Sequence, residues 1–189
     1  NSGSITATAS QTGSSDTAQA IGIYITGSVD GSLVNDGDIT LSADSPNSDA
    51  TATGIYVGGS LSGSIENTGS IDIAVTATDA TVLGIQVDGG ITASGSLVND
   101  GDITIDMDVT DDASVAGIYV NGGTEMAGEI INNGTIAITD LTTGYSHTYY
   151  GIEVRDELTG SLINNGDIII SAEATDDIYL EGIHVSGIS

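Results

Sequence analysis

The sequence has almost no cations and no cysteine, and each shortage excludes a class of function. Arg155 is the single Lys or Arg among 189 residues, against 27 Asp and Glu, which gives a formal net charge of −26 at pH 7. A chain with one cation cannot neutralise phosphate groups, so nucleic acids and anionic membrane surfaces are excluded as direct partners. Because the chain has no Cys, it can form neither disulfides nor thiolate metal sites. No apolar run approaches the roughly 20 residues that a membrane helix needs, so direct membrane insertion is not expected.

Hydrophobic residues are abundant and regularly placed despite this acidity. They make up 39% of the chain, which also has 27 Gly, a single Pro and neither Trp nor Phe. Strongly acidic chains are often disordered, but hydrophobic residues at a fixed spacing indicate a packed core instead.

One eight-residue phrase occurs twice in the sequence. Residues 33–40 read LVNDGDIT, residues 97–104 repeat them letter for letter 64 positions later, and residues 65–72, halfway between, read IENTGSID. The period is therefore about 32 residues. The copies share the motif G-x-[LI]-x-N-x-G-x-I, whose Asn occurs six times: Asn1, Asn35, Asn67, Asn99, Asn132 and Asn164.

A second motif, G-I-x-[VI], follows each of these Asn residues by 17 to 21 positions. Its six copies begin at Gly22, Gly54, Gly84, Gly117, Gly151 and Gly182. Two motifs that recur in phase at a period between about 20 and 50 residues are the signature of a repeat architecture.

The spacing of apolar residues predicts strands. They follow each Asn at every second position, as in Ile71, Ile73 and Val75, which is the alternation of a β-strand. Before the Gly of the second motif the inward positions are −2 and −4, and after it they are +1 and +3. Such a change of parity predicts a corner or bulge at the Gly, where no Cβ fits. Each repeat thus contains a short strand before the Asn, a longer strand after Asn-x-Gly, and a third strand bent at the second Gly.

Three strand faces in about 32 residues make one coil of a parallel β-helix. We therefore expect an all-β β-solenoid of about six coils that forms a single domain over residues 1–189, with repeats near 1–30, 31–62, 63–94, 95–127, 128–159 and 160–189. Stacking places the Asn side chains above one another, where they can hydrogen-bond and satisfy the corner backbone. The expected structural ladder consists of Asn35, Asn67, Asn99, Asn132 and Asn164.

The repeat motifs also resemble those of a known group of proteins. The phrases INNGTI, INNGDI and IENTGSI, each followed by a copy of G-I-x-V, are similar to repeats in the β-helical passenger domains of autotransporters and of haemagglutinin-type adhesins from Gram-negative bacteria. The resemblance covers essentially the whole chain and rests on fold-forming residues. It implies a right-handed parallel β-helix that is secreted and displayed on the bacterial surface in an adhesive or structural role.

Acidic residues cluster in the stretches between the two motifs, and oxygen-only clusters suit Ca²⁺. The candidate Ca²⁺ ligands are Asp106, Asp108, Asp111, Asp112, Asp176 and Asp177. The calcium-binding nonapeptide of repeat-in-toxin proteins is absent from the sequence. The alternative interpretation is therefore a solvated acidic surface without a specific cation, and it includes exposed rows beside the Asn corner such as Asp38, Asp102 and Asp167.

Two further features could bind a ligand or only cover the fold. The third position of the second motif faces outward and carries Tyr24, Tyr56, Gln86, Tyr119, Glu153 and His184. Such a row covers a sheet, or it binds a sugar or another filament. Residues 145–150, YSHTYY, are either a recognition loop or a polar filling of the core, because His147 and Tyr149 occupy inward positions.

No enzymatic function is expected from these residues. Lyases of this fold need several basic residues, and a hydrolase needs one specific pair of carboxylates, which does not stand out among 27 acidic residues. The leading hypothesis is a non-enzymatic extracellular rod, structural or adhesive, on a bacterial surface, with a surface glycan or protein as receptor. The alternative is a filament subunit that stacks end to end, and a weaker alternative is a carbohydrate-active β-helix.

The two ends of the sequence lie in phase with the repeat. Residue 1 is already the Asn of the first motif, and the chain stops shortly after the sixth copy of the second. The open ends of a β-helix expose unpaired strand edges, so we expect self-association end to end, or contact with neighbouring repeats of a longer array.

Overall fold

The computed structural model describes residues 1–122, 125–144 and 146–188, and these residues form an all-β fold. The parts of the chain that are described contain no helix that could cross a membrane. Tyr145, the first residue of the expected recognition segment, lies outside the described residues.

Strands from successive repeats pair in parallel and build three sheets. The back sheet has the order β1 (Ile5–Ser10), β4 (Ile39–Ser45), β7 (Ile71–Ala77), β10 (Ile103–Val109), β14 (Ile136–Gly144) and β17 (Ile168–Ala174). The front sheet contains β2 (Ala18–Ile25), β5 (Ala50–Val57), β8 (Ala80–Val87), β11 (Ala113–Val120), β15 (His147–Leu158) and β18 (Ile178–Ile188), and β12 (Glu125–Met126) pairs with the end of β15. The short sheet contains β3 (Ser32–Asn35), β6 (Ser64–Asn67), β9 (Ser96–Asn99), β13 (Glu129–Asn132) and β16 (Ser161–Asn164).

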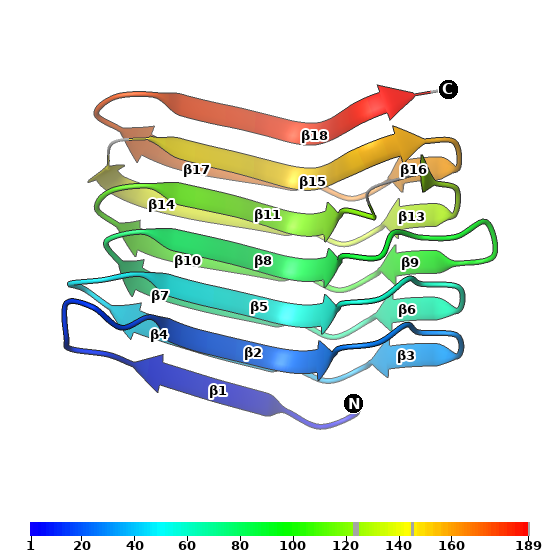
Figure 1. The fold of residues 1–189 in the computed structure, drawn as a ribbon, viewed down its shortest axis with the longest axis horizontal. Coiled ribbons are helices and arrows are strands. Elements are labelled where there is room, and N and C mark those ends of the chain that lie inside the picture. Colours follow the sequence, from blue (N-terminus) through cyan, green and yellow to red (C-terminus); the bar gives the residue numbers. More distant parts are fainter. Residues whose placement is uncertain (123–124, 145, 189) are drawn as a thin grey trace.

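The chain passes through short, back and front sheet in turn and rises by one strand at each passage (Figure 1). In Figure 1 the front strands run left to right and the fainter back strands right to left as the chain climbs, which is a right-handed path. The predicted right-handed parallel β-solenoid of about 6 coils, with about 32 residues in each, is confirmed. We number the coils from the N-terminus, so that coil 2 contains β3, β4 and β5. The described block is wider across a coil than it is tall along the stack (Figure 1).

The bend in the front sheet has the cause that the change of parity predicts. In β5, Ala50 and Ala52 are buried before the Gly, and Ile55 and Val57 are buried after it. A Cβ at Gly54 would lie 2.5 Å from the carbonyl oxygen of Gly84 in the next coil. Gly is therefore required at this corner because the space between coils is too small for a Cβ. An unusual backbone dihedral is not the reason, since the one positive φ among the described residues belongs to Gly90.

An unbroken ladder of Asn side chains runs through the Asn-x-Gly corner. The Nδ2 of Asn67 donates to Oδ1 of Asn99 at 2.7 Å and to the carbonyl oxygen of Gly69 at 3.0 Å. The same pair of bonds recurs from coil to coil, and the Asn side chains of coils 2 to 5 have no exposed surface. Each amide donates toward the next coil along the chain, so the ladder has one direction. These bonds satisfy polar groups that would be costly to leave unpaired inside the stack.

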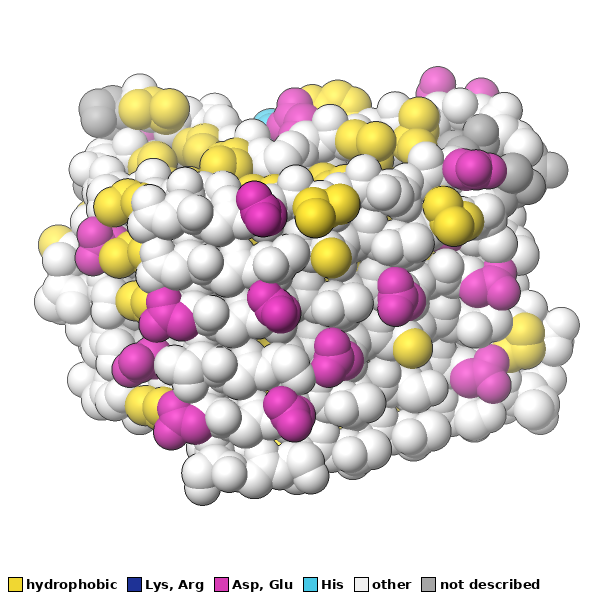
Figure 2. Space-filling model, turned by 180° about the vertical axis from the view of Figure 1, so that it is seen from behind, with side chains coloured by type: hydrophobic (Ala, Val, Ile, Leu, Met, Phe, Trp, Pro, Cys, Tyr) yellow, Lys and Arg dark blue, Asp and Glu magenta, His cyan; other side chains and the backbone are white. Residues whose placement is uncertain are grey.

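Exposed aspartates beside the ladder alternate with hydroxyl side chains. The residues three positions after the Asn are Ser4, Asp38, Ser70, Asp102, Thr135 and Asp167. Ser70 Oγ donates to Asp38 Oδ1 at 3.1 Å, and the Thr135 amide donates to Asp102 Oδ1 at 3.1 Å. Carboxylates in this row are thus two coils, about 9.6 Å, apart, which is close to the Debye length at physiological salt. Figure 2, the view from behind, shows acidic side chains as separate spots over this face, and hydrophobic ones most densely toward the upper end.

Coil 5 departs from the repeat. The pairing of β14 with β17 shifts between Asp140 and Gly144, where β14 has two more residues than its partner over the same span. The bulge lies in the coil that also contains His147 and Tyr149 at the start of β15. The irregular sequence of this segment therefore corresponds to an irregular coil.

Candidate functional site

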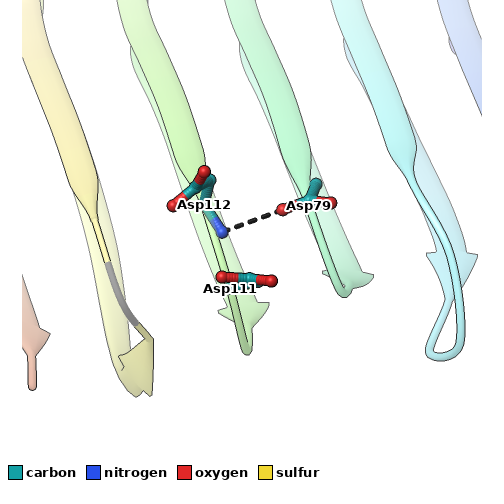
Figure 3. Close-up of side chains that lie close together, drawn as sticks. All are labelled: Asp79, Asp111 and Asp112. Carbon is teal, nitrogen blue, oxygen red and sulfur yellow. Dashed lines mark hydrogen bonds between the residues drawn. The ribbon is translucent and has the colours of Figure 1, made fainter.

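Three aspartates meet at the turn between the back and front sheets. Asp79 lies between β7 and β8, and Asp111 and Asp112 lie one coil further, between β10 and β11 (Figure 3). One carboxylate oxygen from each lies within 4.8 Å of the other two. Asp79 Oδ1 also accepts a hydrogen bond of 3.0 Å from the backbone amide of Asp112, which fixes one carboxylate in place (Figure 3).

This cluster borders a groove on the outer face of the front sheet, which we call the aspartate groove. The groove has a volume of about 540 Å³, and Thr51, Thr81, Ser114 and Thr148 of successive coils lie along it. Asp49, Asp79 and Asp112 form its acidic border. Stacking brings these residues together because each occupies the position directly before its front strand, in register with the next.

The six predicted Ca²⁺ ligands have different environments. Asp111 and Asp112 meet, and Asp79 joins them, although sequence reasoning did not select it. Asp106 and Asp108 are exposed on the outer side of β10, and Asp176 and Asp177 are exposed in the turn before β18. None of these four belongs to a group of three metal-ligating side chains among the residues that the structure describes. The register that brings Asp79 to Asp112 could have been read from the repeat, since both directly precede an inward Ala.

The cluster gives a test that separates the two interpretations of the acidic residues. At low ionic strength Asp111→Asn should raise the melting temperature Tm, because one of three neighbouring negative charges is removed, a gain of up to about 1 kcal/mol. A bound Ca²⁺ would raise the Tm of the wild type by mass action beyond the effect of NaCl at equal ionic strength, and Asp111→Asn would abolish that extra gain. Asp106→Asn, whose cross-strand partners are Ala74 and Thr139, is the control. Equal gains from Ca²⁺ and NaCl would leave the solvated surface as the correct interpretation.

A polar trio lies inside the core of coil 5. Asp140, His147 and Tyr149 are at most 1% exposed, and in register they replace Met107, Ala113 and Val115 of coil 4. The Tyr149 hydroxyl donates to Asp140 Oδ2 at 2.8 Å and lies 2.7 Å from His147 Nδ1. His147 Nε2 lies 2.9 Å from the backbone carbonyl oxygen of Asp111, which can only accept, so this nitrogen carries a proton.

The trio is closed to substrates. Thr142 completes it, because its amide and hydroxyl both donate to Asp140 Oδ1. Burial, and then the hydrogen bond to Asp140, raises the pKa of Tyr149 far above its ordinary value. The His147 and Tyr149 side chains fill the core, as one of the two sequence interpretations proposed, and Asp140 was missed. Asp140 follows Ile136 and Ile138 at every second position, so it lies on the same inward side of β14, and this alternation could have identified it.

Removing one hydroxyl from this trio should destabilise the fold. Tyr149→Phe keeps the ring but leaves Asp140 Oδ2 and His147 Nδ1 facing each other, 3.8 Å apart, in a dry core. We expect a loss of about 1–3 kcal/mol in the free energy of unfolding, measured by denaturant titration. Tyr150→Phe, on the outer face one residue later, should change it by less than about 0.5 kcal/mol. Equal stabilities of the two variants would contradict the role given to the Tyr149 hydroxyl.

The outward row of the second motif borders a second hollow on the front sheet. Two adjoining cavities of about 290 and 230 Å³ share Thr81, Leu83 and Gln86 in their linings. We call the two together the tyrosine trough, because Tyr24, Tyr56 and Tyr119 also line it. Leu83 faces outward at the floor of the trough, yet it is only 8% exposed.

Hydrogen bonds to one carboxylate order the first half of the trough. Asp88 accepts from the Tyr56 hydroxyl at 2.9 Å and from Gln86 Nε2 at 2.8 Å. The rings of Tyr24 and Tyr56 stack with their centres 4.9 Å apart. The hydrogen bond to Asp88 raises the pKa of Tyr56 above its usual value, so its hydroxyl is protonated at pH 7.

The single cation of the chain lies at the other end of the trough. Arg155 Nε donates to Glu153 Oε1 at 2.6 Å, and the guanidinium carbon lies 5.4 Å from the centre of the Tyr119 ring. Glu153 belongs to the outward row, yet it is only 4% exposed. This hydrogen bond raises the pKa of Arg155, and the pair places a fixed carboxylate and a fixed guanidinium beside an aromatic ring.

Sequence and structure comparisons add no relative to this picture. The resemblance of the repeat motifs to surface adhesins therefore stays an expectation from the sequence. No protein family, no curated protein and no solved structure matches this chain.

Proposed function

We propose that this chain is a non-enzymatic β-solenoid with a structural or adhesive role on the outside of a bacterial cell. The observation that supports the proposal best is the uniform stacking along the Asn ladder, with the same Gly corners and the same apolar core in successive coils. Residues of both sequence motifs are fully used in packing, so their recurrence is explained by the need to extend one shape. Apart from the polar trio of coil 5, the core positions stay apolar, whereas outward positions such as Tyr56, Gln86 and Glu153 change in chemical type on the face where a receptor would bind.

Two further features agree with a location outside the cell. The motifs that carry the resemblance to secreted adhesins, Asn-x-Gly-x-Ile and G-I-x-V, are the residues that form the corners of the coil. A formal net charge of −26 keeps such a surface away from nucleic acids and anionic lipids. This acidic surface can still contact uncharged or cationic partners.

The proposed location is tested with antibodies against residues 1–189 and the cells that make the protein. We expect intact cells to be labelled, and external protease to remove the label while a cytoplasmic marker survives. Labelling that needs prior lysis, or resists external protease until lysis, would contradict an extracellular role.

The direction of the Asn ladder favours a second candidate function, a filament subunit that stacks end to end. Asn164 Oδ1 accepts the ladder bond from Asn132, and its Nδ2 donates to the Gly166 carbonyl oxygen. This Nδ2 is the group that would donate to the Asn of a following coil. Asn1, at the opposite end, donates to Asn35, and its own Oδ1, which accepts from the Gly3 amide at 3.3 Å, stands where the other Asn residues accept the ladder bond. Ile178, Leu180 and Ile183 in the last coil are 42%, 44% and 43% exposed, although their equivalents in earlier coils are buried. A further coil stacked on them, as in a second copy placed head to tail or in a continuing array, would bury them and continue the ladder.

Stacking is measured by light scattering and electron microscopy of the purified chain as salt rises. Screening of the charge of −26 should promote end-to-end dimers or filaments. Leu180→Glu, in the last coil, should prevent them, and Thr40→Glu, on an outer face, should not. A chain that stays monomeric at high concentration and high salt would contradict the filament.

A carbohydrate-active β-helix is the weaker alternative. It predicts cleavage products when the chain is incubated with polysaccharides, which the proposed structural or adhesive role does not. Chromatography of the incubated polysaccharides distinguishes the two directly.

A further inference from the structure

We propose that the tyrosine trough binds a linear, uncharged glycan that lies along the solenoid axis across β5, β8 and β11 as far as β15. This inference names the ligand class of the adhesive role proposed above, and it rests on that role. The trough is a concave surface with an apolar floor and a few fixed polar groups, which is the usual composition of a ligand site.

The position of the trough restricts recognition to side chains. β8 pairs with β5 on one side and with β11 on the other, so its backbone amides and carbonyls are occupied by the sheet. A peptide cannot add as a strand here, because strand addition needs a free sheet edge. The ligand must therefore be one that side chains alone can recognise.

The charge of the trough restricts the ligand further. Arg155 is bound to Glu153, and Asp88 lies beside Tyr56 and Gln86, so the fixed charges here sum to negative. Phosphorylated, sulfated and uronic-acid polymers would be repelled by this site and by the net charge of the chain. An uncharged ligand avoids this repulsion.

The side chains that remain suit a pyranose ring. Tyr56 and Tyr119 lie one coil on either side of Gln86, so a row of ring, amide and ring follows the solenoid axis. One face of the Tyr56 ring is stacked on Tyr24, and the Arg155 guanidinium lies over the Tyr119 ring, so the apolar C–H groups of a sugar would contact the remaining surface of these phenols. Amide, carboxylate and guanidinium groups at the edge of the row can accept from and donate to the sugar hydroxyls. Because Gln86 Nε2 is held by Asp88, its amide oxygen is the group offered to a hydroxyl.

The spacing between successive side chains of the row is similar to the spacing between successive sugars in a polysaccharide. Each coil advances the row by about 4.8 Å, which is close to the length of one pyranose residue in an extended chain. The row from Tyr56 to Glu153 spans four coils, so a chain of several sugars could contact equivalent positions in succession. A single monosaccharide would contact only one or two of these side chains.

The test is titration calorimetry of the purified 189-residue chain with two uncharged probes, cellohexaose and N-acetylchitohexaose. We expect at least one probe to bind with a Kd below about 1 mM, with little change between about 0.05 and 0.5 M NaCl. Tyr119→Ala and Gln86→Ala should each weaken binding at least about tenfold, because each removes one contact of the row. Tyr179→Ala is the matched control, since Tyr179 is an exposed tyrosine of the same sheet outside the trough.

Three results would overturn the proposal. These outcomes are the absence of binding by both probes, equal loss in the Tyr179→Ala control, and equally tight binding of polygalacturonate. Circular dichroism melts establish that the Tyr119 and Gln86 variants are folded, and both side chains are partly exposed, so folding should survive. Binding in solution does not depend on cell location or on cleavage assays. A failure of the trough is therefore distinct from a failure of the proposed surface role.

Discussion

Replacement of Ile71 by Asp should unfold at least coil 3, with a loss of about 4 kcal/mol or more in the free energy of unfolding. Ile71 begins β7, has no exposed surface, and lies between Ile39 and Ile103 of the adjacent coils. A carboxylate at this position would have no cation within a core made of aliphatic side chains. Domains are stable by only about 5–15 kcal/mol, so such a loss is a large fraction of the total.

A matched variant separates burial from charge. Ala74→Asp introduces the same carboxylate on the same strand, but on the exposed side. Its cross-strand neighbour Asp106 adds a repulsion of no more than about 1 kcal/mol in water. Thermal melts by circular dichroism, with hydrogen exchange to locate the unfolded coil, should show a large loss for Ile71→Asp only. Similar melts for the two variants would mean that the side of β7 assigned to the core is wrong.

Gly69→Ala should cost about 3 kcal/mol or more, which is unusual for the addition of one methyl group. A Cβ at this position would lie 2.1 Å from the carbonyl oxygen of Gly37 and 2.7 Å from its carbonyl carbon. Both atoms belong to the backbone of the preceding coil, so only a wider spacing of the coils could relieve the clash. That movement would also stretch the hydrogen bond from the Gly69 amide to the Asn35 carbonyl oxygen, which is 3.1 Å long.

The same motif provides the control for this prediction. Gly3 occupies the equivalent position in coil 1, and a Cβ built there meets no atom within 4 Å. Gly3→Ala should therefore change stability by less than about 0.5 kcal/mol. Chemical denaturation of the two variants measures the difference. If both variants lost the same stability, backbone conformation rather than contact between coils would explain the glycine.

The regular part of the fold could be predicted from the sequence because packing between coils depends on very few residue types. The buried side of β7, the bend at Gly54 and the parallel register all follow from parity and a fixed period. Each of these features is repeated in several coils, so a single misleading residue cannot hide it. Repetition also explains why the fold agrees with the expectation, whereas the right-handed path was implied by the resemblance of the motifs.

The irregular features were harder to predict because each occurs once. Asp140 stands at an inward position, but Asp is so common in this chain that its parity carried little weight. The bulge in β14 also obscures the register there. Glu153 was correctly placed in the outward row, but alternation did not indicate that it is buried and hydrogen-bonded to Arg155, two residues later on the same strand. Such contacts depend on side-chain conformations, which periodicity does not specify.

Acidic and hydroxyl residues alternate from coil to coil beside the ladder. Insertion or deletion of coils therefore preserves this alternation only when two coils are added or removed together. Deletion of one coil would place Asp38 directly beside Asp102, whereas removal of two coils would leave a hydroxyl next to every carboxylate of the row. Duplication by two coils preserves the alternation in the same way. The phrase LVNDGDIT recurs after 64 residues, twice the length of a coil, and the coil between them has Ser70 in place of Asp. Selection against like charges stacked in this row, in contrast to the stacked Asp49, Asp79 and Asp112 of the aspartate groove, would favour changes of two coils at a time. Relatives of different length should then differ by multiples of about 64 residues.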